Sequence, residues 1–281
     1  MKHILLPTDF SENAYNAISY AVQLYKDMDC KFYILHTYNP INISTGGSLD
    51  RYAPPALQDI EKEAAAKRLK EIEDSLYEKF NNANHTFITM ASFNLLISQM
   101  KIVIKENDID VVIMGTKGAT GAKEIFIGTN TMYAIKKLKF PVIAVPSGFK
   151  YEQPSEVLLP TDYKFSKSNK YISLIRELCE VHTSRLHMLN VYNHLAVKEE
   201  QQQTEDFLDV FFSDNLHLFH VAGKQELIEA IEDFETKYKV NFLVMIHNKH
   251  NFFENLLFKP VVDQMVYHTN VPFLVIPSET Q

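Results

Sequence analysis

The sequence predicts an α/β protein made of two tandem copies of one unit, each a five-stranded parallel sheet with helices on both faces. Short apolar runs alternate with segments of helical periodicity, which is the order that produces parallel sheets. The same order then starts again in the second half of the chain. At 281 residues, the chain also has the length of two domains.

The first half supplies five strands in order. They are predicted at residues 4–6, 31–37, 86–90, 111–114 and 142–145. Helical segments separate them, and Ser11 is a good N-cap for the first of these. The connection over residues 39–57 is long, and loops of this length are either functional or disordered. Crossover helices between parallel strands cover both faces of the sheet.

An internal repeat divides the chain. Leu-Leu-Pro-Thr-Asp at residues 5–9 returns at residues 158–162, and residues 242–277 align without a gap on residues 111–146 (242 − 111 = 131 and 277 − 146 = 131). The polar segment between the copies contains Gly148 and Pro154. We therefore expect one domain over residues 1–148 and a second over residues 149–281.

A glycine-rich stretch in the first copy predicts an anion site. Gly115, Gly118, Gly121 and Gly128 lie between a buried strand and a helix that begins at Thr129. Glycine lets the backbone approach a phosphate, and the N–H groups and dipole of a helix start attract it. The spacing is not that of a Walker P-loop, because no Gly-Lys-Ser/Thr follows.

The second copy acts as an internal control for this stretch. It keeps the flanking strands and the helix but has no glycine at the four aligned positions, which hold Ile246, Lys249, Phe252 and Lys259. We infer that the glycines of the first copy serve a ligand and not the fold, although a merely flexible loop is the alternative. The apolar residues 252–258 either fill the equivalent crevice of the second copy or form a partner surface.

Composition excludes several other classes of protein. A formal net charge of −7 argues against a nucleic-acid coat, and no apolar run has the length of a membrane span. Cys30 and Cys179 form no motif and are expected to be reduced thiols. With no signal-peptide pattern at residues 1–12, we expect a cytoplasmic protein.

The histidines give no metal motif. His247 and His250 are interpreted as surface residues, and His217 and His220 as exposed neighbours in a strand. His36 is expected to be a hydrogen-bonded structural residue, not a base. We expect no protein metal site.

The glycine spacing follows a known family pattern. Glycine, two residues, glycine, nine residues, glycine and Ser or Thr is complete here as Gly115, Gly118, Gly128 and Thr129. The sequence resembles the universal stress protein family, whose ATP-binding members carry this motif. Residues 7–11, 35–36 and 141–146 also look like the family. The resemblance covers both halves, but the second half departs from it at every glycine of the loop.

The resemblance implies a Rossmann-like fold of the adenine nucleotide alpha hydrolase type, with the first and fourth strands adjacent. It implies that the end of the first strand lines the adenosine, that Thr37 lies beside the adenine, and that the helix start binds the phosphates. Asp9 would help to place Mg²⁺ through water. Residues 142–145 and 273–276 would pair. The implied cofactor-binding residues are Pro7, Thr8, Asp9, Thr37, Met114, Gly115, Gly118, Gly128, Thr129 and Asn130.

The expected function is therefore ATP-dependent regulation of a stress response, with one ATP site, in the first domain, and an ability to form a homodimer. No catalytic dyad or triad is apparent in the sequence. Two alternatives stay open. The first is a slow ATPase or phosphotransferase in which Thr129 or a water receives the phosphate, and the second is an interaction module without a ligand.

Overall fold

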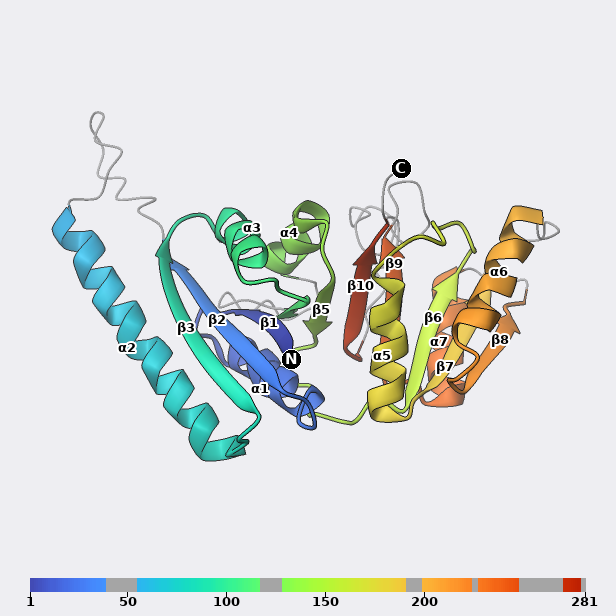
Figure 1. The fold of residues 1–281 in the computed structure, drawn as a ribbon, viewed down its shortest axis with the longest axis horizontal. Helices are drawn as coiled ribbons and strands as arrows, with labels where there is room; N and C mark the ends of the chain where they lie inside the picture. The colour runs from blue at the N-terminus through green and yellow to red at the C-terminus, as the bar shows by residue number, and fades with distance from the viewer. Residues whose placement is uncertain (39–54, 117–127, 191–198, 224–226, 248–269, 279–281) are drawn as a thin grey trace, which may run out of the picture. The chain divides into compact units, whose positions relative to one another are not determined.

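The computed structural model describes residues 1–38, 55–116, 128–190, 199–223, 227–247 and 270–278. By its internal contacts the chain divides into two compact units, Met1–Leu138 and Lys139–Gln281. Each unit is an α/β structure in which parallel strands alternate with helices (Figure 1). The predicted fold class is confirmed.

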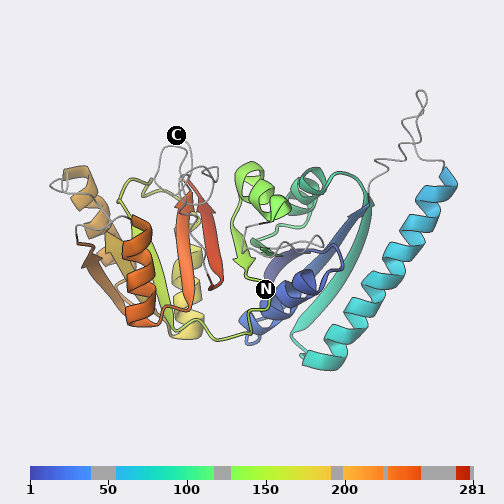
Figure 2. The ribbon, with the colours of Figure 1, turned by 180° about the vertical axis from the view of Figure 1, so that it is seen from behind.

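The first unit contains four parallel strands in the order β3-β2-β1-β4. Helices α1 and α2 contact each other, and α3 and α4 do the same, so the two pairs cover the two faces of the sheet (Figure 2). The bounds of its elements are β1 Lys2–Pro7, α1 Glu12–Leu24, β2 Cys30–Tyr38, α2 Pro55–Phe80, β3 His85–Phe93, α3 Leu96–Glu106, β4 Val111–Gly115 and α4 Thr129–Leu138.

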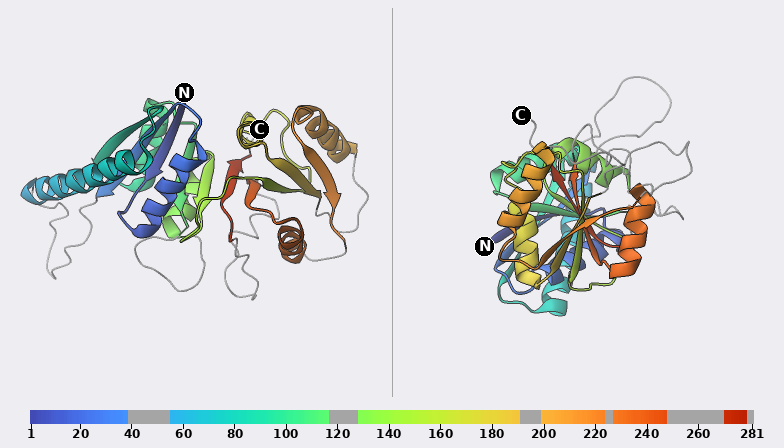
Figure 3. Two further views of the ribbon diagram at one scale, coloured as in Figure 1. Left: turned by 90° about the horizontal axis from the view of Figure 1, so that it is seen from below. Right: turned by 90° about the vertical axis from the view of Figure 1, so that its right-hand side faces the viewer.

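The second unit contains six strands in the order β5-β10-β9-β6-β7-β8. Helices α5 and α6 lie on one face of this sheet and α7 lies on the other (Figure 3). The bounds of its elements are β5 Val142–Val145, β6 Glu156–Thr161, α5 Ile172–His182, β7 Arg185–Asn190, α6 Glu199–Phe211, β8 His217–Val221, α7 Leu227–Tyr238, β9 Phe242–His247 and β10 Phe273–Pro277.

Strand β5 runs antiparallel to β10, with Phe273 opposite Ala144 and Val275 opposite Val142. These are the two strands for which pairing was predicted. This pairing explains why β5, the last strand of the first sequence copy, is grouped with the second unit by its contacts. The boundary after residue 148 stays a prediction from the repeat.

The register of the central strands repeats between the copies. In the first unit Ile4 lies opposite Val111, and in the second Val157 lies opposite Phe242. The two shifts (157 − 4 = 153 and 242 − 111 = 131) are those of the sequence repeat. Because a slip of one residue would turn each side chain to the other face, the shared register shows that both copies bury the same positions.

Burial also accounts for the cysteines. Cys30 begins β2 and Cys179 lies on α5, and both side chains are buried. Burial raises the pKa of each thiol to about 12. The thiolate is the reactive form of cysteine, so both residues are inert core groups at neutral pH.

Candidate functional site

The candidate site lies at the carboxyl ends of β1 and β4, two parallel neighbours in the first sheet. The chain leaves β1 for β2 on one side and later returns to β4 on the other, so the strand order reverses between them. Open α/β sheets bind ligands in the crevice formed at such a reversal. Pro7 ends one strand and Thr8 follows it, and Met114 and Gly115 end the other, so the fold brings both predicted motifs to one edge.

A tight turn after β1 joins the strand to α1. The N–H of Phe10 donates to Thr8 Oγ1 at 3.0 Å, and the N–H of Ser11 donates to Asp9 Oδ1 at 3.0 Å. Ser11 then caps α1 by accepting from the N–H of Ala14 at 3.1 Å. The turn buries Thr8 and leaves Asp9 exposed.

The turn holds Phe10 in a left-handed conformation with φ of 64°, which is unusual for a bulky residue. Neighbouring elements fix it there. The ring of His36 lies 4.2 Å from the ring of Phe10, and the guanidinium of Arg68 lies 4.1 Å from its centre on the α2 side. His36 also donates from Nδ1 to the carbonyl oxygen of Thr8 at 2.8 Å, which confirms the structural role expected for this histidine.

The second unit repeats the turn without the glycine loop. The N–H of Tyr163 donates to Thr161 Oγ1 at 2.9 Å, and the N–H of Lys164 donates to Asp162 Oδ1 at 3.0 Å. Tyr163 has φ of 58°, close to that of Phe10. The Thr-Asp pair therefore builds the strand-to-helix turn in both units, and any contact of Asp9 with a ligand is an additional role.

Gly115 has a packing role that corrects the inference drawn from the repeat. A Cβ atom at Gly115 would lie 2.9 Å from the carbonyl oxygen of Asn13 on α1, and it would also overlap the Asn13 side chain. Real Cβ atoms do not approach other atoms so closely. The absence of a glycine in the second copy does not show that Gly115 is dispensable for the first, because α1 packs closely against β4 whereas α5 does not pack as closely against β9.

Helix α4 begins beside the end of β4. The N–H of Gly128 donates to the carbonyl oxygen of Thr116, and the hydroxyl of Thr131 donates to the carbonyl oxygen of Gly115 at 2.7 Å. Thr129 and Asn130, in the first turn of α4, are exposed. Thr131 is buried and was not predicted as part of the site. Its position within a run of three polar residues at a helix start was the available signal.

Thr116 is a second residue that the sequence argument treated only as a spacer. Its side chain is buried, with 3% exposed, and its hydroxyl has no hydrogen-bond partner within the described residues. A buried hydroxyl without a partner is costly. The end of β4 therefore contains one donor or acceptor that a ligand could satisfy.

The other predicted residues divide into two groups. Thr37 lies half-buried on β2, opposite Ser92 of β3, at the same edge of the sheet as Thr8. Gly118 and Gly121 lie outside the described residues, as do His250 and the apolar residues 252–258. Among the described residues, no group of three or more His, Cys, Asp or Glu side chains could hold a metal ion.

Two histidines of the second unit correct an expectation. His217 and His220 were predicted to be exposed, but both are half-buried. His217 Nε2 lies 3.0 Å from Asp209 Oδ1, and His220 Nε2 lies 3.0 Å from His187 Nδ1. Their partners come from α6 and β7, which the local sequence pattern of β8 does not reveal.

The doubly wound sheet and the crevice where its strand order reverses define an α/β protein of the Rossmann-like class. The model of the universal stress protein family matches residues 1–146, and the chain belongs to this family. It is therefore a stress-response protein by family. In the described part of the chain, no helix combines the length and the apolar character that crossing a membrane would require.

Two relatives from Methanocaldococcus jannaschii match one half of the chain. Universal stress protein MJ0531 is 23% identical over 147 residues, which cover 51% of this chain and 81% of the relative. Universal stress protein MJ0577 is 26% identical over 153 residues, which cover 51% of this chain and 94% of the relative. The family assignment therefore rests on one half of the chain.

The solved structures extend the similarity in fold to both halves. A universal stress protein from Archaeoglobus fulgidus superposes with a TM-score of 0.70 at 16% identity and covers 98% of both chains. A universal stress protein from Pseudomonas aeruginosa gives a TM-score of 0.58 at 10% identity and covers 99% of this chain and 94% of its own. At these identities the likeness concerns the fold alone.

Proposed function

We propose that the first unit binds ATP in the crevice between the ends of β1 and β4 and that the bound nucleotide regulates the protein's role in the stress response. The observation that carries the proposal is the meeting of three features at one edge of the sheet. They are the Thr8–Asp9 turn, the buried and unpartnered hydroxyl of Thr116 after β4, and the exposed first turn of α4. Cytoplasmic location and a homodimer stay predictions from the sequence.

The start of α4 suits the phosphates. The first N–H groups of a helix have no carbonyl partner within it, and Thr129 and Asn130 are exposed there. Each hydrogen bond to a charged phosphate contributes about 1.5–3 kcal/mol, and the helix terminus contributes about 0.3–1 kcal/mol more. A few such contacts support micromolar affinity, about −8 kcal/mol, after the cost of association.

The end of β4 suits the sugar and the base. Met114 is buried, Gly115 is packed against Asn13 of α1, and the buried hydroxyl of Thr116 lacks a partner within the described residues. Pro7 at the end of β1 and Thr8 just after it lie at the same edge of the neighbouring strand, and the motif residue Gly118 belongs to the same proposal. A nucleoside placed here would meet an apolar floor and polar groups at its rim, as small-molecule sites usually provide.

Asp9 fits a magnesium ion that arrives with the nucleotide. Mg²⁺ keeps several waters and binds proteins through one or two carboxylates together with phosphate oxygens. Asp9 is an exposed carboxylate beside the crevice. We propose that it holds the ion through water, and that the phosphates supply the remaining ligands.

The two copies of the turn allow a matched test. Asp9→Ala and Asp162→Ala each remove a carboxylate that accepts one backbone N–H at 3.0 Å, so both should cause a similar small loss of stability. Only Asp9→Ala should weaken binding of Mg-ATP, by about tenfold, the equivalent of one charged hydrogen bond. Calorimetric titration of the full chain measures the affinity, and thermal unfolding measures the stability.

Equal ATP affinity in the two variants would contradict the role of Asp9. Incubating the wild-type protein with labelled ATP separates the proposal from its rivals. Recovery of intact, bound ATP supports regulation by nucleotide, whereas release of ADP or formation of a phosphoprotein indicates a slow ATPase or phosphotransferase. Failure to bind any nucleotide favours an interaction module without a ligand.

A further inference from the structure

The second unit contains a cavity of about 550 Å³ between the edge of its sheet and α7. This volume is typical of small-molecule sites. None of the lining residues belongs to the Thr161–Tyr163 turn, so the cavity is not the counterpart of the ATP crevice. The lining residues that matter below are His220 on β8, and Asp233, Phe234, Lys237 and Tyr238 on α7.

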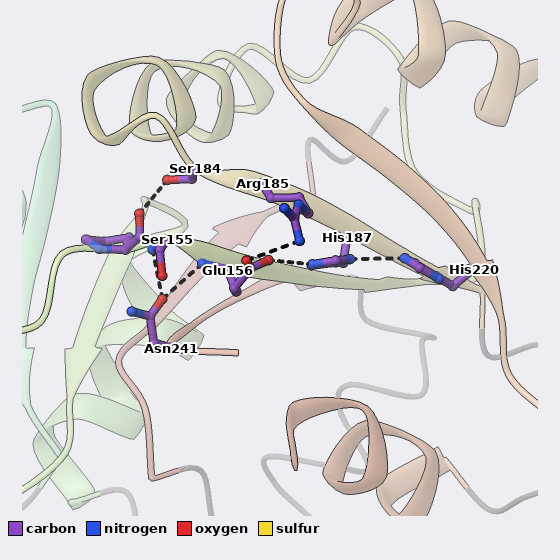
Figure 4. A network of polar contacts seen from close by, with 8 residues as sticks. Ser155, Glu156, Ser184, Arg185, His187, His220 and Asn241 are labelled. Atoms are coloured by element: carbon purple, nitrogen blue, oxygen red, sulfur yellow. Dashed lines mark hydrogen bonds and ion pairs between the residues drawn. The ribbon is translucent and has the colours of Figure 1, made fainter. Parts of the chain in front are cut away.

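A chain of hydrogen-bonded side chains runs from the cavity across the neighbouring strands β8, β7 and β6 (Figure 4). His220 Nε2 lies 3.0 Å from Nδ1 of His187, whose own Nε2 lies 2.7 Å from Glu156 Oε2. The other oxygen of Glu156 lies 3.4 Å from Nη1 of Arg185. His187 is fully buried. Three strands therefore hold two imidazoles and a carboxylate in line, and only the His220 end reaches the cavity.

The hydrogen bonds fix the direction of each donor. Glu156 as a carboxylate can only accept, so His187 donates its Nε2–H to it. In the neutral pair, Nδ1 of His187 then accepts the Nε2–H of His220, and Nδ1 of His220 keeps a lone pair. That nitrogen has no hydrogen bond within the described residues. A proton added there turns it into a donor and breaks none of the existing hydrogen bonds.

The surroundings of His220 disfavour this extra proton when the cavity holds no anion. The rings of Phe234 and Tyr238 lie 4.8 and 5.3 Å from that of His220. Burial lowers the pKa of His220, and the nearby charges of His187 and Lys237 lower it further. An anion in the cavity would instead raise the pKa of His220, because it stabilises the protonated imidazole. The charged or titratable groups around the two imidazoles are Glu156, Arg185, Asp233, Lys237 and Tyr238.

We propose that this cavity is a second ligand site that binds a small organic carboxylate together with one proton, which the chain His220–His187–Glu156 takes up. On binding, Nδ1 of His220 gains the proton from solvent and donates it to the carboxylate. His220 keeps its hydrogen bond to His187, which rests against Glu156. The proposal is independent of ATP binding in the first unit.

The charge of the lining selects a monoanion. With His220 protonated, two cations, His220 and Lys237, face one carboxylate, Asp233. The lining then carries one net positive charge, whereas without the proton it is neutral. The rings of Phe234 and Tyr238, which both line the cavity, offer apolar surface beside these groups. A carboxylate on an aromatic or other apolar body matches both features.

Benzoate is a suitable probe, because it stays a monoanion near neutral pH. Calorimetric titration of the full chain should show binding that is at least about tenfold tighter near pH 6 than near pH 8, as expected for a protonated imidazole. Repeating the titration near pH 8 in buffers with different ionisation enthalpies should reveal uptake of about one proton per benzoate bound. Benzamide, a neutral molecule of the same shape, should show no proton uptake.

Variants separate this site from a network that only stabilises the fold. His220→Phe should weaken benzoate binding at least about tenfold near pH 6 and abolish proton uptake. His217→Gln is the matched control, since His217 lies on the same strand but is hydrogen-bonded to Asp209 and does not line the cavity. It should behave as wild type. Lys237→Met, at an exposed position of α7, should weaken binding but keep the proton uptake.

Thermal unfolding shows whether each variant is folded. If His220→Phe does not fold, Lys237→Met still tests the site. The proposal is overturned if wild-type protein does not bind millimolar benzoate near pH 6, or if binding is independent of pH. It is equally overturned if folded His220→Phe protein retains both the affinity and the proton uptake.

Discussion

Replacing Gly115 with valine should destabilise the first unit by about 1–3 kcal/mol or more, the usual cost of overpacking a core. Even a Cβ atom at this position would lie 2.9 Å from the backbone oxygen of Asn13, and valine adds two methyl groups. Backbone cannot turn away as a flexible side chain can, so α1 or β4 must shift. Urea denaturation of the full chain, with a probe in each unit, measures the loss and assigns it to a unit.

Gly223→Val provides the control. Gly223 has no atom within 4 Å of the position where a Cβ would be built, so this substitution should change stability by less than about 0.5 kcal/mol. Adding Asn13→Ala to Gly115→Val should recover only part of the loss. It removes the overlapping side chain of Asn13 but leaves its backbone oxygen in place. If Gly115→Val is as stable as wild type, Gly115 is not a packing glycine, and the inference that it serves only a ligand is restored.

Replacing Gly118 with valine should abolish ATP binding without unfolding the protein. Gly118 lies outside the described residues, so the expectation rests on the glycine spacing and on its loss in the second copy. A side chain here would keep the phosphates or ribose from the backbone. The expected loss of affinity is at least tenfold, or about 1.4 kcal/mol, measured by calorimetric titration with ATP, with unfolding curves that match wild type.

The aligned position in the second copy is Lys249 (118 + 131 = 249). Lys249→Val introduces the same side chain into the loop that lacks glycines. It should leave ATP affinity unchanged. Loss of binding in both variants would point to a general disturbance of such loops, and retention in both would remove Gly118 from the site.

Much of the fold was predictable because it rests on local patterns. Continuous apolar runs predicted the buried strands β1 and β4, and the repeat predicted the matching strands β6 and β9. Ser11 as an N-cap and His36 as a structural residue were also predicted correctly. The strands and the N-cap depend on residue types within a few positions of one another, and the repeat shows the same local patterns a second time.

The contacts that sequence reasoning missed join distant segments. Nothing near Gly115 shows that Asn13 of α1 approaches it, and nothing near His220 shows that it meets a buried histidine of the neighbouring strand. Thr131 was overlooked because its partner, the carbonyl oxygen of Gly115, lies 16 residues earlier in the sequence. Composition constrains which residues are buried, but packing decides which of them meet.

The most direct test of the account is native mass spectrometry of the gently purified full chain, with and without added ATP. The account predicts one ATP per chain at saturation, retained in Lys249→Val and lost in Gly118→Val. Two nucleotides per chain, none at saturation, or a single one that survives Gly118→Val would contradict the placement of one ATP site in the first unit.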